Sequence, residues 1–242
     1  MSLAIRRGFL LPEKGLFSRY DAAKGTIIGY KLPNGATFEH AATYAAPLAF
    51  SAISNATSAI CTVVGATLVV GDILLVTSGW TALNNKVVRV SAATATAITL
   101  EGIDTTSTTI YPAGSGTGSL KKILTWVQIP QITDVAFSGG DQNYQDVVFL
   151  EDAQGRQLPT DKSAASMVLT VADDPTLAYV PIVTAADVAQ TVQAARLNLP
   201  GVDKLYYGAY TSFSLQPAVS RSNILTRTVS LALQAAPTRY LS

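Results

Sequence analysis

The sequence predicts a mainly β protein with one flanking α-helix and a small β-barrel inserted between two parts of its core. Three observations support this fold class. Thr, Val, Ile and Tyr dominate short runs that are separated by Gly, Pro, Asn and Asp, as in strands joined by turns. Residues 48–122 shift to Ala, Thr, Ser, Val and Gly and carry few charges. Only the segment at 184–197 has the apolar spacing of a helix.

The barrel is expected at 48–122 because short β-type runs there are closely spaced, and Gly114 to Gly118 form a flexible exit. A Pro33-Asn34-Gly35 turn precedes the barrel and follows a strand at 26–30. The core is then expected to consist of residues 1–47 and 123–242. Its later elements are, in order, a strand at 124–129, a polar loop at 138–164, a strand at 167–171, the helix, and strands at 204–216 and 224–234.

The helix prediction depends on capping signals at both ends of its segment. Thr184 is the expected N-cap, Asp187 follows three residues later, and Pro200-Gly201 would end the helix. We expect the helix to cover one face of a sheet. The residues on its predicted apolar face are Val188, Val192, Ala195 and Leu199.

The composition excludes several classes of protein. Apolar residues make up 48% of the 242 residues, and the formal net charge is +1, so the chain is not intrinsically disordered. This near-neutral balance also argues against a general nucleic-acid binder, which needs a strongly basic domain. Apolar runs are too short to span a membrane or to serve as a signal peptide. With Cys61 as the single cysteine, we expect folding in a cytoplasm without disulfides.

Candidate catalytic residues are few, and we expect no enzyme activity, cofactor or metal. His40 is the single histidine, so a catalytic triad would depend on it alone. Ser119 and Lys122 have the spacing of a nucleophile pair but lie where a loop enters a strand rather than on a helix. The glycines at 114, 116 and 118 lack the pattern of a phosphate-binding loop.

The charges are unevenly distributed along the chain. Residues 1–31 contain six Lys or Arg against two acids, and residues 188–242 contain five against one. Residues 134–187 contain nine acids against two basic residues. Chance clustering of surface charge is one interpretation. The other is a head-to-tail contact between copies, in which an acidic face of one copy meets a basic face of the next.

The order of the later elements carries a resemblance to a known family. A Trp-bearing strand at 124–129 leads to the acid-rich loop at 138–164, a strand, a helix and two closing strands, the last of which includes Ile224 to Leu231. This order resembles the tail tube (major tail) proteins of long, non-contractile bacteriophage tails over residues 1–47 and 123–242. The segment at 48–122 resembles a small β-barrel that some of these proteins carry as an insertion, and we expect it on the outer surface.

The resemblance implies a tail-tube-type β-sandwich, six copies of which self-assemble into a ring. Inner sheets of neighbouring copies would join edge to edge, and rings would stack through the loop at 139–162 into a hollow tube for DNA ejection. It implies a structural virion protein that assembles in the host cytoplasm without membrane insertion. Its partners would be itself, other tail proteins such as the tape measure and terminator proteins, and DNA in transient, non-specific passage.

The residues expected at these contacts follow from the resemblance and from the charges. The ring-stacking candidates are Asp141, Asp146, Glu151, Asp152 and Arg156, and their basic partners would be Arg6, Arg7, Arg221 and Arg227. The candidates for the channel wall or the subunit interface are Thr228, Ser230, Tyr206 and Tyr210. A polar wall without Lys or Arg would leave DNA mobile, because it does not bind the phosphates.

Another β-rich, ring-forming tail component is the alternative function. A tail terminator, a distal tail protein or an adhesion module would form single rings but no long tubes. Negative-stain microscopy of the purified protein distinguishes the two functions.

Overall fold

The computed structural model describes residues 18–21, 26–29, 34–151, 153–201 and 203–241. Arg6, Arg7 and Asp152 of the predicted contacts therefore lie outside the described residues. The chain divides into two compact units, residues 1–34 and 35–242. The described part of the first unit is an antiparallel hairpin of β1 (Ser18–Asp21) and β2 (Thr26–Gly29).

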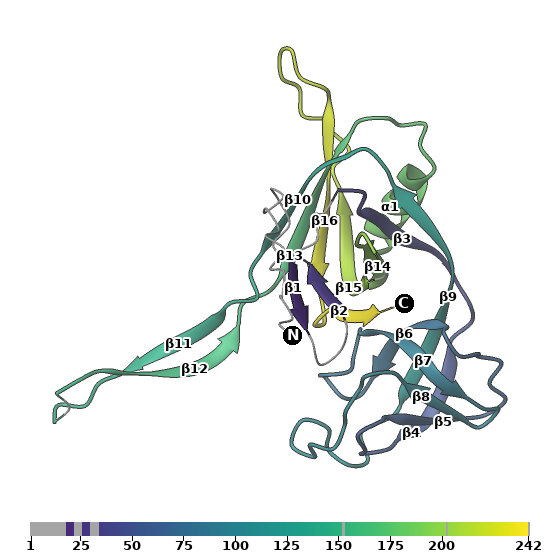
Figure 1. Ribbon diagram of the computed structural model, residues 1–242, viewed down its shortest axis with the longest axis vertical. Helices are drawn as coiled ribbons and strands as arrows, with labels where there is room; N and C mark the ends of the chain where they lie inside the picture. Colours follow the sequence, from purple (N-terminus) through teal and green to yellow (C-terminus); the bar gives the residue numbers. More distant parts are fainter. Residues whose placement is uncertain (1–17, 22–25, 30–33, 152, 202, 242) are drawn as a thin grey trace, which may run out of the picture. The chain divides into compact units, whose positions relative to one another are not determined.

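The second unit contains fifteen strands and one helix among its described residues, which confirms the predicted mainly β fold class. A large sheet has the strand order β10-β13-β16-β15-β14-β3-β9, with every pair antiparallel (Figure 1). Its strands are β3 (Thr37–Tyr44), β9 (Gly118–Ile129), β10 (Ile132–Ser138), β13 (Ser166–Ala172), β14 (Gln193–Asn198), β15 (Asp203–Phe213) and β16 (Thr226–Leu233). The short β17 (Thr238–Leu241) pairs with the first residues of β15.

The large sheet curls around one apolar core. This core contains side chains from the central strands, from both outer parts of the sheet and from the helix α1 (Tyr179–Ala189). Its members are Phe38, Ile129, Met167, Leu169, Val171, Tyr179, Val183, Ala195, Tyr207, Ala209, Phe213, Val229 and Leu231. In a flat sheet β9 and β13 would lie roughly 24 Å apart, at about 4.8 Å per strand, so the two halves must face each other across the core.

Strands between β3 and β10 close into a small barrel. They are β4 (Leu48–Ile53), β5 (Ile60–Val63), β6 (Ile73–Ser78), β7 (Val87–Ala93) and β8 (Ala97–Leu100), together with the first residues of β9. The pairings run β9-β4-β5-β8-β7-β6 and return to β9. Trp80 is buried in this barrel and donates its Nε1–H to the carbonyl of Pro112 at 2.8 Å.

One long strand belongs to both the barrel and the large sheet. Residues 118–122 of β9 pair with β4 and β6 in the barrel, and residues 123–129 pair with β3 in the large sheet. The barrel is therefore joined to the sheet by a continuous, hydrogen-bonded strand rather than by a linker.

The predicted helix boundaries are wrong. The helix begins at Tyr179, five residues before the expected cap, and ends at Ala189, where Gln190 adopts a left-handed conformation. Thr184 lies inside the helix and donates its hydroxyl to the carbonyl of Val180. The expected C-terminal half is instead β14, a central strand with Ala195 facing the core and Ala194 facing the barrel. Apolar residues on both faces of a strand can imitate helical spacing, which explains the error.

Among the described residues, α1 is the single helix, and no helix has the length and apolar character needed to cross a lipid bilayer.

Candidate assembly surfaces

The acid-rich segment forms a separate two-stranded hairpin of β11 (Gln142–Val147) and β12 (Arg156–Lys162). In Figure 1 this hairpin extends away from the large sheet of the same unit. The predicted stacking residues Asp141, Asp146, Glu151 and Arg156 are all exposed on it. The structure thus brings four of the five predicted stacking residues onto one projecting element. Their contact with another copy stays a prediction.

Two glycines at the root of this hairpin set its direction. Gly139 and Gly140 have φ angles of +78° and +84°, a region that favours glycine. A Cβ atom on Gly139 would clash with the backbone carbonyl oxygen of Ala164, whereas the nearest atom to one on Gly140 is a Cβ at 3.8 Å. The backbone at Gly139 therefore lies too close to that at Ala164 for any residue with a side chain.

The predicted basic partners lie in different environments. Arg221 is exposed in the loop between β15 and β16. Arg227 forms an ion pair of 2.6 Å with Asp173 of the same chain, and its guanidinium lies 5.6 Å from the ring centre of Phe213. Both partners of the pair are largely shielded from solvent. Arg227 thus already has an acidic partner in its own chain, and its contact with an acid of the next ring stays a prediction.

Thr228, Ser230 and Tyr210 lie on one polar face of the large sheet. Cross-strand register places them on the side opposite the apolar core, and Tyr210 is 41% exposed. In the part of this face formed by β10, β13, β16 and residues 210–213 of β15, Asp134 is the single charged residue and there is no Lys or Arg. The residues of the face are Asp134, Ala136, Ser138, Ser166, Val168, Thr170, Tyr210, Ser212, Thr228, Ser230 and Ala232.

The polar face ends at strand edges that are open among the described residues. β10 pairs only with β13, so its other edge has no strand beside it. At the other side, β14 pairs with β15 only as far as Ala209, so residues 210–213 of β15 pair with β16 alone. A groove of about 490 Å³ lies there, lined in part by Asp187, Gln190 and Tyr210.

Tyr206 has a different environment from Tyr210, four residues later in the same strand. Its ring is 4% exposed and packs against Trp126 and Tyr240 in an apolar cluster between the barrel and the large sheet. This burial corrects the expectation that Tyr206 reaches a channel wall or a neighbouring copy. The members of the cluster are Ala41, Leu75, Val87, Ile123, Ala194, Tyr206 and Tyr240.

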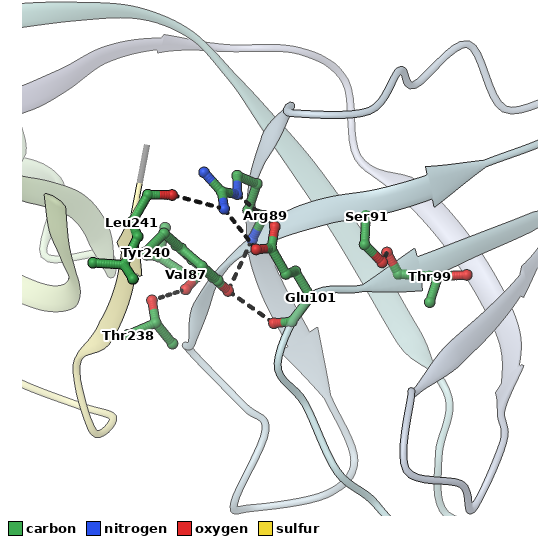
Figure 2. Close-up of polar contacts among 8 residues, drawn as sticks. All are labelled: Val87, Arg89, Ser91, Thr99, Glu101, Thr238, Tyr240 and Leu241. Atoms are coloured by element: carbon green, nitrogen blue, oxygen red, sulfur yellow. Dashed lines mark hydrogen bonds and ion pairs between the residues drawn. The ribbon is translucent and has the colours of Figure 1, made fainter. Parts of the chain in front are cut away.

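Polar contacts reinforce this junction, as Figure 2 shows. The hydroxyl of Tyr240 in β17 accepts a hydrogen bond from the backbone N–H of Arg89 and donates one to the carbonyl of Glu101, both at 3.1 Å. The Arg89 guanidinium pairs with the Glu101 carboxylate, lies over the Tyr240 ring and donates to the carbonyl of Leu241. Hydrogen bonds from the Arg89 guanidinium, together with its charge, lower the pKa of Glu101. The C-terminal strand is thereby fastened to β7 and to the residue after β8.

The backbones of the barrel and the sheet also touch at one point. A Cβ atom on Gly208 of β15 would clash with the carbonyl oxygen of Asn85, which lies in the turn between β6 and β7. Asn85 itself has a φ of +62°. Only glycine allows so close an approach. The barrel therefore contacts the sheet through backbone atoms as well as through side chains.

The candidate catalytic residues His40 and Lys122 make hydrogen bonds or ion pairs with other residues of the chain. His40 is buried, donates its Nδ1–H to the carbonyl of Ala41, and accepts at Nε2 from the Thr211 hydroxyl at 3.0 Å. Burial lowers the pKa of His40, so the imidazole stays neutral. Lys122 pairs with Asp72 at 2.8 Å. No group of three or more His, Cys, Asp or Glu side chains within the described ranges is placed to hold a metal ion.

Two features of these surfaces were missed in the sequence. The hairpin carries exposed apolar residues at its tip, and the barrel contacts the sheet through a buried aromatic cluster. The run Val147 to Leu150 between acids was a detectable signal for the first feature. The second joins residues from seven strands, which no local pattern reveals.

Comparison with known families gives a match over the later part of the chain. Residues 78–242 match a family model described as phage tail tube protein, TTP. The matched range covers more than half of the chain and starts inside the barrel, so it includes β7 and β8 as well as most of the large sheet. No curated protein matched the chain.

Proposed function

Because the chain belongs to the phage tail tube protein family, and is thus a structural protein of a phage tail, we propose that six copies form a ring and that rings stack into a tube for DNA. The family membership supports the tail role. The observation that carries the finer proposal is the polar face, bounded on both sides by open strand edges.

Ring closure would use these two edges. The four strands β10, β13, β16 and β15 alternate in direction, so β10 of one copy would lie antiparallel to β15 of a neighbour with the same orientation. Adding a strand to an open edge satisfies its backbone groups. The other open edge, at residues 123–129 of β9, runs in the same direction as β10 and would require parallel pairing, which is slightly less stable.

The size of such a ring is compatible with DNA passage. Six joined four-stranded sheets, at about 4.8 Å per strand, form a wall roughly 115 Å around and roughly 37 Å across. Side chains that reach about 5 Å inward leave a bore of roughly 27 Å, which is wider than a DNA duplex. Strand tilt would widen it further.

The chemistry of the polar face suits a channel wall. DNA carries about one negative charge per 1.7 Å of its axis, and a wall with Lys or Arg would retain it. The face contributes hydroxyl groups and, from Asp134, one negative charge. Such a wall repels DNA weakly and leaves it free to slide.

The barrel would then lie outside the tube. The large sheet curls, so the outer side of β10, β13 and β16 is the polar face, whereas the outer side of β3, β14 and the start of β15 contacts the barrel. A ring with the polar face toward its axis directs the barrel outward. In the virion, we propose that the tube surrounds the tape measure protein and ends at the terminator, after assembly in the host cytoplasm.

Negative-stain microscopy and sedimentation velocity of the purified protein test the proposal. Hexameric rings and tubes are expected, whereas single rings without tubes would favour a terminator or distal tail protein. In the variant Tyr210→Glu, a second acid faces Asp187 across the groove, so ring formation should be lost. Val188→Glu, on the exposed part of α1, is the matched control and should form normal rings. Normal rings of Tyr210→Glu would refute pairing at this edge.

A further inference from the structure

The tip of the β11–β12 hairpin is apolar as well as exposed. Val148 is 66% exposed, Leu150 is fully exposed, and Phe149 between them is also exposed. We call these three residues the hairpin tip. Exposed apolar clusters mark contact sites. The hairpin tip can therefore make apolar contacts in addition to the ionic contacts of the acids that flank it.

A second exposed apolar surface lies in the loop at residues 214–225, between β15 and β16. Leu215, Val219, Ile224 and Leu225 are all exposed there, and Arg221 is the only charged residue of the loop. The loop is anchored at its base, where the Ala218 N–H donates to the carbonyl of Thr226 at 2.7 Å. We call it the β15–β16 loop.

The two surfaces lie at opposite ends of the large sheet. The hairpin leaves the sheet where Ser138 pairs with Ser166, and Ser166 pairs with Ala232 at the end of β16. The β15–β16 loop joins Phe213 to Thr226, at the beginning of β16. The whole length of β16 therefore separates them, so one copy cannot bring its own two surfaces together.

We infer that the hairpin tip of one copy packs onto the β15–β16 loop of a second copy. The two surfaces differ, so the contact is head to tail and repeats without limit. The charges agree with this pairing, because Asp146 and Glu151 flank the tip and Arg221 lies in the loop. The inference rests on the proposed stacking of rings and adds which surfaces meet and that the contact is mainly apolar.

The apolar groove along α1 is a less suitable partner for the tip. Pro175, Leu177 and Val188 line part of it. Asp174 precedes this groove and Asp187 lies on the same helix, and both would repel the acids beside the tip. The β15–β16 loop instead offers an apolar surface of opposite charge.

Two double variants test the contact in the full chain. The tip variant is Val148→Ser with Leu150→Ser, and the loop variant is Val219→Ser with Ile224→Ser. Each should form single rings but no tubes in negative stain. Because the changed side chains are exposed, circular dichroism and the urea midpoint should match the wild type. The control is Val64→Ser with Val70→Ser, which removes exposed apolar groups from the barrel and should leave tubes intact.

A mixture of the two variants gives the sharpest result. Rings of the loop variant keep an intact tip, and rings of the tip variant keep an intact loop, so mixing should produce pairs of rings and nothing longer. Tubes formed by the loop variant alone, or no ring pairs in the mixture, would overturn the inference. Wild-type protein that forms no rings would overturn the proposed function together with it.

Charge reversal supplies an independent arm of the test. Glu151→Arg should shorten the tubes, and adding Arg221→Glu should restore them if these residues meet across the contact. A double variant no better than Glu151→Arg alone would count against the assigned pairing.

Discussion

Removal of the Tyr240 hydroxyl should destabilise the junction between the barrel and the large sheet. Tyr240 is 6% exposed, and its hydroxyl satisfies the N–H of Arg89 and the carbonyl of Glu101. Tyr240→Phe leaves both backbone groups without this partner, and an unsatisfied buried group costs about 1–3 kcal/mol. Because both residues are only partly buried, we expect a loss near the lower limit for each, or about 2 kcal/mol in total.

Urea unfolding followed by tryptophan fluorescence measures this loss. Trp80 lies in the barrel core, and Trp126 lies beside Tyr206 at the junction, so Trp80→Phe and Trp126→Phe backgrounds report the two regions separately. The assay should use the tip variant, which we expect not to form tubes. Tyr210→Phe is the control, since its exposed ring lies away from the junction, and it should change the free energy of unfolding by less than about 0.5 kcal/mol.

The result also tests whether the barrel and the sheet fold as one unit. We expect the two tryptophans to report the same transition in the wild type, because β9 and the aromatic cluster join both regions. A Tyr240→Phe value within 0.5 kcal/mol of the wild type would refute the energetic argument. Separate transitions in the wild type would refute the coupling.

Three further predictions concern the hairpin root, the polar face and the barrel core. Gly139→Ala should prevent tube formation in microscopy because its Cβ atom meets the Ala164 carbonyl, whereas Gly140→Ala should cost only about 1 kcal/mol of backbone strain and retain tubes. Thr228→Lys with Ser230→Lys should permit tubes but slow DNA ejection, measured by dye uptake. The control variant, with asparagine at both positions, should form tubes and eject DNA at the normal rate. Unchanged ejection by the lysine variant would contradict a DNA-lining role. Burial raises the pKa of Cys61 to about 12 from 9.0, so its contribution to stability is complete below pH 9 and is lost as pH rises toward 12, by about 1.4 kcal/mol per unit. Urea titrations at pH 8 and 10.5 measure how much the free energy of unfolding falls between the two pH values. This fall should be smaller in Cys61→Ala than in the wild type, and an equal fall would contradict this prediction.

Local patterns predicted much of the chain because much of it is governed by local chemistry. The last strand was expected at 224–234, and β16 occupies residues 226–233 with Val229 and Leu231 buried on one face. The helix boundaries could not be predicted in the same way. Gln193–Asn198 is buried on both faces by strands and side chains distant in sequence, and its apolar spacing alone does not distinguish a strand from a helix.

Among the residues predicted at assembly contacts, some environments could be predicted from the local sequence and others could not. Exposure of the hairpin acids followed from a polar, glycine-rich segment, which has too few apolar groups to be buried. The environments of Arg227 and Tyr206 did not follow from local pattern. Asp173 and Tyr240 become their neighbours only when β16 and β17 pair with strands far away in the chain.

The barrel is therefore better regarded as part of the tube subunit than as a tethered decoration. A decoration needs only a flexible connection, whereas here β9 is shared, the turn at Asn85 touches the backbone at Gly208, and β17 is fastened to the barrel through Tyr240. The side-chain and backbone contacts lie on the same side of the sheet as the polar face, but over β3, β14 and the first half of β15. None of them involves β10, β13, β16 or residues 210–213, which form the polar face and its open edges. Force applied to the barrel from outside would thus be transmitted to β15, which carries both the barrel contact and the edge proposed for ring closure.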